Sequence, residues 1–96
     1  MTYLVNTSPE ALDDLDQIVA YIAQDKPSVA IDYALALIAK IQTLEENPKR
    51  CPVILESRIM DYEIRHLIFH PYRILYRIEE KNVTVLRILH SARKLD

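Results

Sequence analysis

Two alternating segments near the end of the chain constrain its fold most. Residues 72–78 read Tyr-Arg-Ile-Leu-Tyr-Arg-Ile and residues 83–89 read Val-Thr-Val-Leu-Arg-Ile-Leu, with a charged turn between them. Successive side chains of a strand point to opposite faces, so Arg73, Leu75 and Arg77 should share one face and the intervening Tyr and Ile residues the other. We expect the second face to pack and the first to present cations to a partner.

The same alternation in the next strand places Val83, Val85, Arg87 and Leu89 on one face. If Arg65 of the preceding strand lies opposite Arg73, the surface opposite the helices carries four arginines: Arg65, Arg73, Arg77 and Arg87. Guanidinium groups bind phosphate and carboxylate bidentately, which favours RNA or an acidic peptide as the partner. The alternative is that these arginines form intramolecular pairs with Glu56, Glu63, Glu79 or the acidic end of the second helix.

The first half of the chain predicts a short strand followed by two helices. Residues 2–6 can form the strand, and Thr7 and Glu10 have the spacing of a capping box before a helix that begins near residue 8. Apolar residues then recur at steps of three and four, with a break at residues 25–27, until Asn47-Pro48. We therefore expect an antiparallel helical hairpin.

The second half predicts three strands, over residues 62–69, 72–79 and 83–89, after an irregular segment from residue 48 to 60. The chain contains no glycine, and Asn82 is the residue we expect to take a positive φ in the last turn. The expected fold class is α+β, an N-terminal α-helical hairpin packed on a small antiparallel β-sheet, in a single domain spanning residues 1–96.

Charge divides the chain into an acidic and a basic half. Residues 1–48 hold two lysines against eight Asp and Glu, whereas residues 49–96 hold ten Lys and Arg against six. The overall charge of −2 weighs against a dedicated nucleic-acid binder, which is usually strongly basic. The start of the sequence lacks the pattern of a secretory signal, and no apolar run has the length of a membrane span, so we expect a cytoplasmic protein without membrane contact.

The sequence offers no pattern typical of a metal or cofactor site. Cys51 is the single cysteine, and His66, His70 and His90 lie without a carboxylate or thiolate at ligand spacing. Three aspartates near the start of the first helix fit a solvated face, where negative charge stabilises the helix: Asp13, Asp14 and Asp16. No phosphate-binding loop, serine-nucleophile motif or nucleotide fingerprint is present. We expect no metal and no cofactor.

In their order along the chain, these segments resemble the RelE/ParE superfamily of bacterial toxins. The resemblance lies in Leu-Asp-Gln-Ile-Val-Ala-Tyr-Ile in the first helix, the Asn47-Pro48 stop, Tyr-Arg-Ile-Leu-Tyr-Arg, the Glu-Glu-Lys-Asn turn, Val-Leu-Arg-Ile-Leu-His and a closing Ala-Arg. The ending His-Ser-Ala-Arg-Lys-Leu over residues 90–95 is more similar to the ParE branch. The resemblance implies the toxin of a type II toxin–antitoxin pair, as used in plasmid stabilisation, with a cognate antitoxin as partner and a toxin–antitoxin hetero-oligomer.

The two branches of this superfamily imply different chemistry. Resemblance to ParE implies inhibition of DNA gyrase by protein–protein contact, in which case no residue is catalytic and the partner-binding candidates are the basic residues Arg65, Arg73, Arg77, Arg87 and Arg93. Resemblance to RelE implies a ribosome-dependent mRNA endonuclease, with Arg65, Arg73, His90 and Arg93 as its machinery. No tyrosine follows Tyr76, so the C-terminal catalytic element of the ribonuclease branch is expected to be absent, and the ParE reading is favoured. A third reading is a binding module that has lost toxicity and only sequesters an antitoxin.

Overall fold

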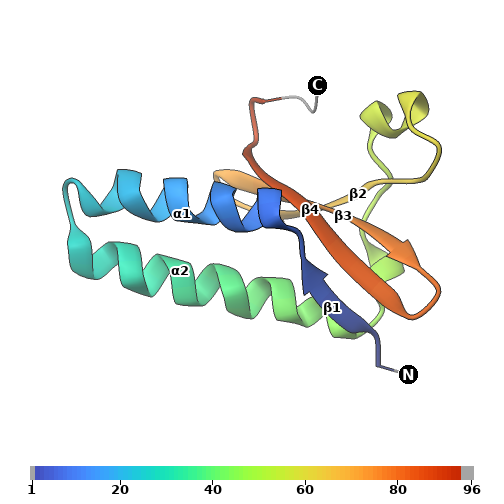
Figure 1. Cartoon of the computed structure of the whole chain (residues 1–96), viewed down its shortest axis with the longest axis horizontal. Coiled ribbons are helices and arrows are strands. Elements are labelled where there is room, and N and C mark those ends of the chain that lie inside the picture. The colour runs from blue at the N-terminus through green and yellow to red at the C-terminus, as the bar shows by residue number, and fades with distance from the viewer. Residues whose placement is uncertain (1, 94–96) are drawn as a thin grey trace.

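Two antiparallel helices lie against one face of a four-stranded sheet in the computed structural model, which describes residues 2–93 (Figure 1). The elements follow one another as β1 (Leu4–Thr7), α1 (Pro9–Ala23), α2 (Pro27–Gln42), β2 (Arg65–Phe69), β3 (Tyr72–Glu79) and β4 (Asn82–His90). Three short 3-10 helices connect α2 to β2, namely Thr43–Glu45, Pro48–Arg50 and η3 (Leu55–Ile59). None of the described helices is long and apolar enough to cross a membrane.

The N-cap of helix α1 lies one residue after the predicted cap. The N-cap is Ser8, which has an extended backbone and whose Oγ accepts a hydrogen bond from the Ala11 amide at 3.1 Å. Pro9 follows at the first helical position, where its missing N–H is not needed. The predicted capping box of Thr7 and Glu10 was therefore wrong, because Thr7 still belongs to β1 and is paired with β4.

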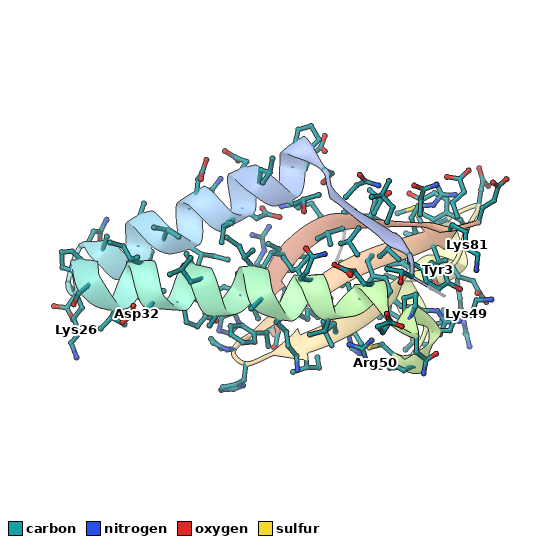
Figure 2. The ribbon with its side chains drawn as sticks, turned by 90° about the horizontal axis from the view of Figure 1, so that it is seen from below. Tyr3, Lys26, Asp32, Lys49, Arg50 and Lys81 are labelled. Atoms are coloured by element: carbon teal, nitrogen blue, oxygen red, sulfur yellow. The ribbon has the colours of Figure 1, made fainter. Side chains whose placement is uncertain are left out.

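The sheet is mixed rather than antiparallel throughout. Its order is β1-β4-β3-β2, and β2, β3 and β4 form the predicted antiparallel meander. Strand β1 is the exception, because it pairs parallel to β4 from Leu4 opposite Asn82 to Thr7 opposite Val85. A parallel pair needs a long crossover, which the two helices and the first two strands of the meander provide. At this edge the Lys81 ammonium lies 4.9 Å from the centre of the Tyr3 ring (Figure 2).

The hairpin between β3 and β4 differs from the prediction in one residue. Glu79 pairs with Asn82, so the loop consists of Glu80 and Lys81. Glu80 takes the positive φ, 57°, and Asn82 is already part of the strand. The conformation expected of an asparagine is thus adopted by a glutamate, because strand register decides which residues form the loop.

The main core lies between the helices and the sheet. The alternation predicted for β3 is confirmed, since Tyr72, Ile74, Tyr76 and Ile78 all face this core. Tyr76 is fully buried, and Ile74 is buried beside it. The helices contribute a stripe of apolar residues, including Ala11, Ile18, Leu37 and Ile41. Burial of this stripe is what holds the hairpin on the sheet.

The other face of the sheet also packs, which corrects the expectation of one packing face and one cationic face. A second, smaller core joins Ile54, Ile64, Leu75 and Leu89, with Met60, Tyr62 and Leu86 against it. The prediction for β4 failed after Val85, because a bulge opposite Leu75 and Tyr76 shifts the alternation by one residue. Ile88 therefore faces the helices and Leu89 faces the second core.

Candidate functional site

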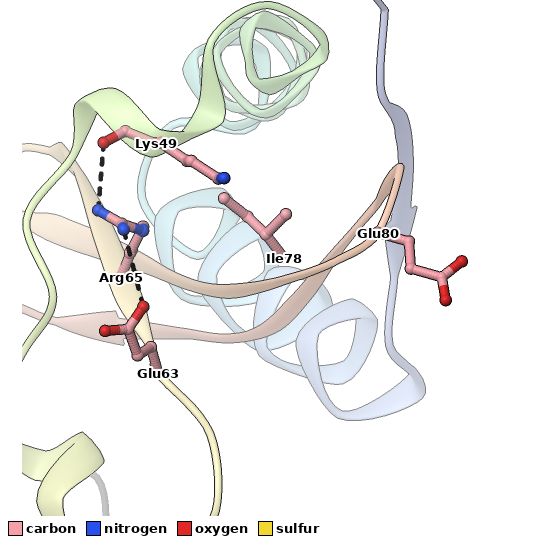
Figure 3. Close-up of a pocket in the computed structure, with 5 residues that line it drawn as sticks. All are labelled: Lys49, Glu63, Arg65, Ile78 and Glu80. Atoms are coloured by element: carbon pink, nitrogen blue, oxygen red, sulfur yellow. Dashed lines mark hydrogen bonds and ion pairs between the residues drawn. The ribbon is translucent and has the colours of Figure 1, made fainter.

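The predicted arginine cluster does not form, because Arg65 lies on the helix-facing side of the sheet. It is paired with Tyr76, a residue of the main core, whereas Arg73 is paired with Ile68. The Arg65 guanidinium donates to the carbonyl oxygens of Lys49 at 3.1 Å and Cys51 at 2.6 Å and approaches Glu63 at 3.8 Å (Figure 3). These contacts hold the segment after α2 against the start of β2.

The polar cavity beside Arg65 has a volume of about 330 Å³ and is lined by Lys49, Glu63, Arg65, Ile78 and Glu80. Two basic, two acidic and one apolar side chain line it, and Figure 3 shows the Glu80 carboxylate pointing away from the others. Next to it, the Tyr76 hydroxyl donates to the Pro48 carbonyl oxygen at 2.5 Å. Burial, with a contact to the Cys51 thiol, raises the pKa of Tyr76 above its ordinary range. The polar cavity and the Tyr76 hydrogen bond therefore both belong to structural contacts of a buried turn.

Arg73 lies on the opposite face of the sheet and is buried, with 7% of its surface exposed. Its Nη2 donates to Glu56 Oε2 and to the Arg93 carbonyl oxygen, both at 2.6 Å. Of the two alternatives for this residue, the intramolecular pair with Glu56 is therefore confirmed. The pair closes one side of a cavity of about 300 Å³.

His66 lines the same cavity, beside Arg73. Burial lowers the pKa of His66, the nearby Arg73 guanidinium lowers it further, and the Glu56 carboxylate opposes both effects. Its Nδ1 is buried and lacks a hydrogen-bond partner among residues 2–93. No sequence pattern singles out His66, because only the fold places it next to the ion pair of Arg73 and Glu56.

Arg77, further along β3, also uses its cation within the molecule. The guanidinium lies 3.9 Å from the centre of the Tyr62 ring, a cation–π contact, and 3.7 Å from Glu79. The predicted alternative pairing with Glu79 is therefore confirmed as well. Tyr62, expected to begin a strand, lies in the irregular segment before β2.

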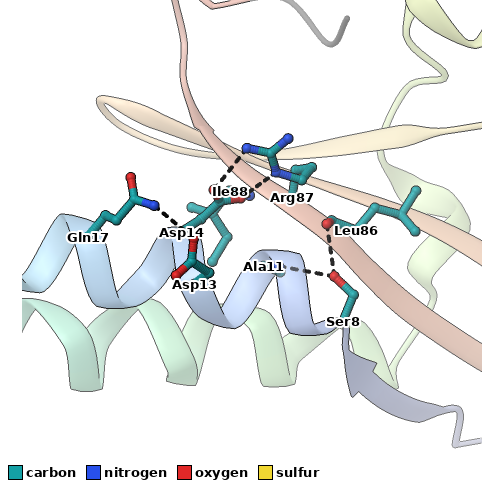
Figure 4. A network of polar contacts seen from close by, with 8 residues as sticks. All are labelled: Ser8, Ala11, Asp13, Asp14, Gln17, Leu86, Arg87 and Ile88. Atoms are coloured by element: carbon teal, nitrogen blue, oxygen red, sulfur yellow. Dashed lines mark hydrogen bonds and ion pairs between the residues drawn. The ribbon is translucent and has the colours of Figure 1, made fainter.

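Arg87 forms a bidentate pair with a residue that sequence reasoning misplaced. Its Nε and Nη2 donate to the Asp14 carboxylate at 2.7 and 3.0 Å, and the Ile88 amide donates to Asp14 Oδ2 at 2.9 Å (Figure 4). This hydrogen bond raises the pKa of Arg87. Asp14 was expected on a solvated face and is instead 8% exposed. Its position three residues after Ala11 and four before Ile18, on the apolar stripe, was the available signal.

His90 and Arg93 lie together at the end of β4. Both line a small cavity of about 150 Å³ that also includes Tyr21 and Tyr72. The Ala92 amide donates to His90 Nδ1 at 3.2 Å, so His90 is a strand-end residue with a local hydrogen bond. The remainder of the predicted tail, residues 94–96, lies outside the described residues.

A family model described as the ParE toxin of type II toxin-antitoxin systems, parDE, matches residues 5–95. The chain belongs to this family. Toxin RelE2 of Caulobacter vibrioides is a related protein, 36% identical over 84 residues that cover 86% of this chain and 89% of that protein. The protein is thus a type II toxin of the RelE/ParE superfamily, as the resemblance implied.

Solved structures share the fold of this ParE-family toxin. A chromosomal ParDE system from P. aeruginosa superposes with a TM-score of 0.77 at 18% identity, covering 93% of this chain and 96% of that one. The RelBE2 toxin-antitoxin complex from Mycobacterium tuberculosis has a TM-score of 0.62 at 22% sequence identity, and the match covers 94% of this chain and 99% of that one. An archaeal RelE-RelB complex from Pyrococcus horikoshii has a TM-score of 0.64 at 18% sequence identity, and the match covers 98% of this chain and 100% of that one.

The toxin does not gather the four residues of the ribonuclease reading. His90 and Arg93 share a cavity, but Arg65 and Arg73 lie on opposite faces of the sheet, and each already binds other groups of the molecule. No group of three or more His, Cys, Asp or Glu side chains in residues 2–93 could hold a metal ion. Of the predicted machinery, Arg73 lies next to the end of β4, where it donates to the Arg93 carbonyl oxygen, whereas Arg65 is separated from Arg73 by the sheet.

Proposed function

We propose that this ParE-family toxin acts in the cytoplasm by binding DNA gyrase, without chemistry of its own, and that a cognate antitoxin neutralises it. The observation that carries the proposal is the separation of Arg65 from Arg73 by the sheet. Cleavage of RNA needs a base, an acid and a group that stabilises negative charge, all arranged around one phosphate. Two arginines on opposite faces cannot stabilise the same phosphate.

Two features of the surface support an antitoxin as partner. An apolar stripe on the outer side of α2 consists of Ile31, Leu35 and Ile38, which are 62%, 62% and 47% exposed. Strand β2 is an edge of the sheet, and in the described part of the chain the backbone pairing on its outer side involves only its first two residues, which pair with the segment at Pro52 and Val53. An amphipathic helix fits the stripe and an extended segment fits the edge, so one antitoxin chain that folds on binding can use both.

The second candidate function is a ribosome-dependent mRNA endonuclease. One relative at 36% identity carries the name RelE2, and His90 and Arg93 lie in one cavity, with a histidine available as a proton donor or acceptor. If this function is correct, changing His90 should lower the rate of cleavage by about 10²- to 10⁴-fold.

Substitutions at the end of β4 separate the two functions. We expect the parent toxin to inhibit supercoiling by purified gyrase and to leave mRNA on translating ribosomes uncut in primer extension. Arg93→Ala should weaken growth inhibition more than His90→Gln, because an exposed arginine can anchor a protein interface. Specific mRNA cleavage that disappears in His90→Gln would establish the second function instead.

The antitoxin is tested by co-expression with the neighbouring gene. We expect a stable complex on size exclusion, and we expect Leu35→Glu on the exposed stripe of α2 to weaken it. The matched control is Leu12→Glu, which adds the same charge to a half-exposed leucine of α1. Absence of any complex with the parent protein would contradict the antitoxin part of the proposal.

A further inference from the structure

The cavity of about 300 Å³ on the far face of the sheet combines apolar and charged walls. It lies where residues 53–62, here called the η3 strap, pass beside β2 and β3. Its lining consists of Val53, Ile54, Leu55, Glu56, His66 and Arg73. The arrangement surrounds a buried guanidinium with aliphatic side chains.

Two buried nitrogen atoms beside this cavity lack partners. Arg73 Nε and His66 Nδ1 are both inaccessible to solvent and accept or donate no hydrogen bond within residues 2–93. Arg73 uses one side of its planar fork, through Nη2, for Glu56 and the Arg93 carbonyl. A buried polar group without a partner costs about 1–3 kcal/mol. A carboxylate that bound the Nε–Nη2 edge of Arg73, a residue that is 7% exposed, would also satisfy Nε, which the contact of Glu56 with Nη2 leaves without a partner.

The strap that carries Glu56 is weakly anchored. No residue of η3 is buried, and the helix has no side-chain N-cap. Leu55 and Ile59 are 73% and 76% exposed, more than any other large apolar residue among residues 2–93. The strap is attached mainly through Ile54 before η3 and through Met60 and Tyr62 after it. Glu56 can therefore move away from Arg73 at a small cost in buried apolar area.

We infer that this cavity binds a carboxylate group carried by an apolar segment of the toxin's protein target, which takes the place of Glu56 on Arg73. The exposed aliphatic residues around the cavity favour a protein segment over a nucleic acid, and the guanidinium fork supplies the charge complementarity. A buried arginine surrounded by apolar residues is also typical of a binding hot spot. This inference depends on the proposed function in one respect, namely that the target of the toxin is a protein.

The test uses the full-length toxin and a synthetic probe, the peptide acetyl-Leu-Glu-Leu-amide. In proton–nitrogen NMR spectra, the Nε–H signal of Arg73 should shift and saturate as this peptide is added. The matched peptide acetyl-Leu-Gln-Leu-amide should bind at least about tenfold more weakly, because it lacks the charge. The variant Glu56→Gln should bind the acidic peptide about tenfold more tightly than the parent, since the internal competitor is gone.

Two further variants make the test decisive. Glu63→Gln removes a carboxylate from Arg65, on the other face, and should leave peptide binding unchanged. Arg73→Lys keeps the charge but loses the fork, and should weaken binding about tenfold even if Glu56→Gln fails to fold. Equal binding of the Glu and Gln peptides, or no gain in a folded Glu56→Gln variant, would overturn the inference. A shift of Arg73 by a short oligoribonucleotide but not by the peptide would overturn it as well.

The peptide experiment does not involve gyrase, so it separates this inference from the proposed function. Gyrase inhibition that is the same in the parent and Glu56→Gln, together with absent peptide binding, would refute the cavity while leaving the function intact. Peptide binding by a toxin that does not inhibit supercoiling would support the cavity and refute gyrase as the target.

Discussion

Two arginines of the sheet each contact a carboxylate from another segment, and the two segments differ greatly in how they are held. Asp14 projects from α1, a helix of 15 residues in the main core, and accepts three hydrogen bonds, two from Arg87 and one from the Ile88 amide. Glu56 projects from a five-residue 3-10 helix without a buried residue, and its Oε2 accepts from Arg73 at 2.6 Å.

Two ion pairs of the same chemical kind thus serve different purposes in this fold. On the helix side, β4 extends past the end of β1, and Ser8 and Asp14 bind its free backbone groups, with Ser8 Oγ donating to the Leu86 carbonyl at 2.9 Å. This carboxylate replaces a missing strand neighbour and is part of the fold. On the far side, Glu56 neutralises the buried Arg73 cation from a segment that has no buried residue of its own.

The largest effect is expected from Asp14→Ala. Removing this carboxylate leaves the Ile88 amide buried without a partner and separates α1 from Arg87, so the free energy of unfolding should fall by about 3 kcal/mol. Urea unfolding followed by circular dichroism measures it. Asp13→Ala is the matched control, because the neighbouring exposed carboxylate accepts only from Gln17, at 2.8 Å, and its removal should change stability by less than about 0.5 kcal/mol.

Hydrogen exchange should show a comparable contrast without any substitution. The Ile88 amide, which donates to the Asp14 carboxylate, should exchange only through global unfolding. The Met60 amide, which donates to the Ser57 carbonyl oxygen within the strap, should exchange through local opening. We expect a difference of about 100-fold or more in protection. Equal protection of the two amides would mean that the strap is as firmly held as the helix.

A smaller effect is expected from Glu56→Ala. Arg73 keeps its bond to the Arg93 carbonyl, and water can reach the guanidinium once the strap shifts, so the free energy of unfolding should fall by about 1 kcal/mol. The measurement is the same urea titration. A loss as large as that of Asp14→Ala would show that the two pairs are equivalent and that Glu56 is not exchangeable.

The smallest effect concerns pH and His66. Burial and Arg73 lower its pKa, although Glu56 opposes them. The unfolded chain therefore takes up the proton first, near pH 6.5, and stability contributed by neutral His66 is lost as the pH falls below that value. Between pH 7.5 and 5.5, the parent should lose no more than about 0.5 kcal/mol relative to His66→Gln, because solvent screens the partly exposed ring. A relative gain for the parent would reverse the sign and contradict this account.

The sequence determined the features that depend on local pattern. The apolar periodicity of residues 11–22 and 30–44 predicted both helices, and the alternation of residues 72–78 predicted which side of β3 is buried. The order of these segments was sufficient for the superfamily, which the family match over residues 5–95 supports. The intramolecular partners Glu56, Glu63 and Glu79 were already among the alternatives, because they are three of the six acidic residues of the basic half.

Only the tertiary structure decided which residues meet. A single bulge near Val85 reverses the facing of Ile88 and Leu89, and no local propensity in β4 marks its position. The parallel docking of β1 leaves the end of β4 without a strand neighbour, and this turns Asp14 from a surface residue into a buried acceptor. Register and crossover connect residues more than 70 positions apart, so the buried arginine pairs, and the cavity beside Arg73, follow from long-range packing that sequence spacing does not encode.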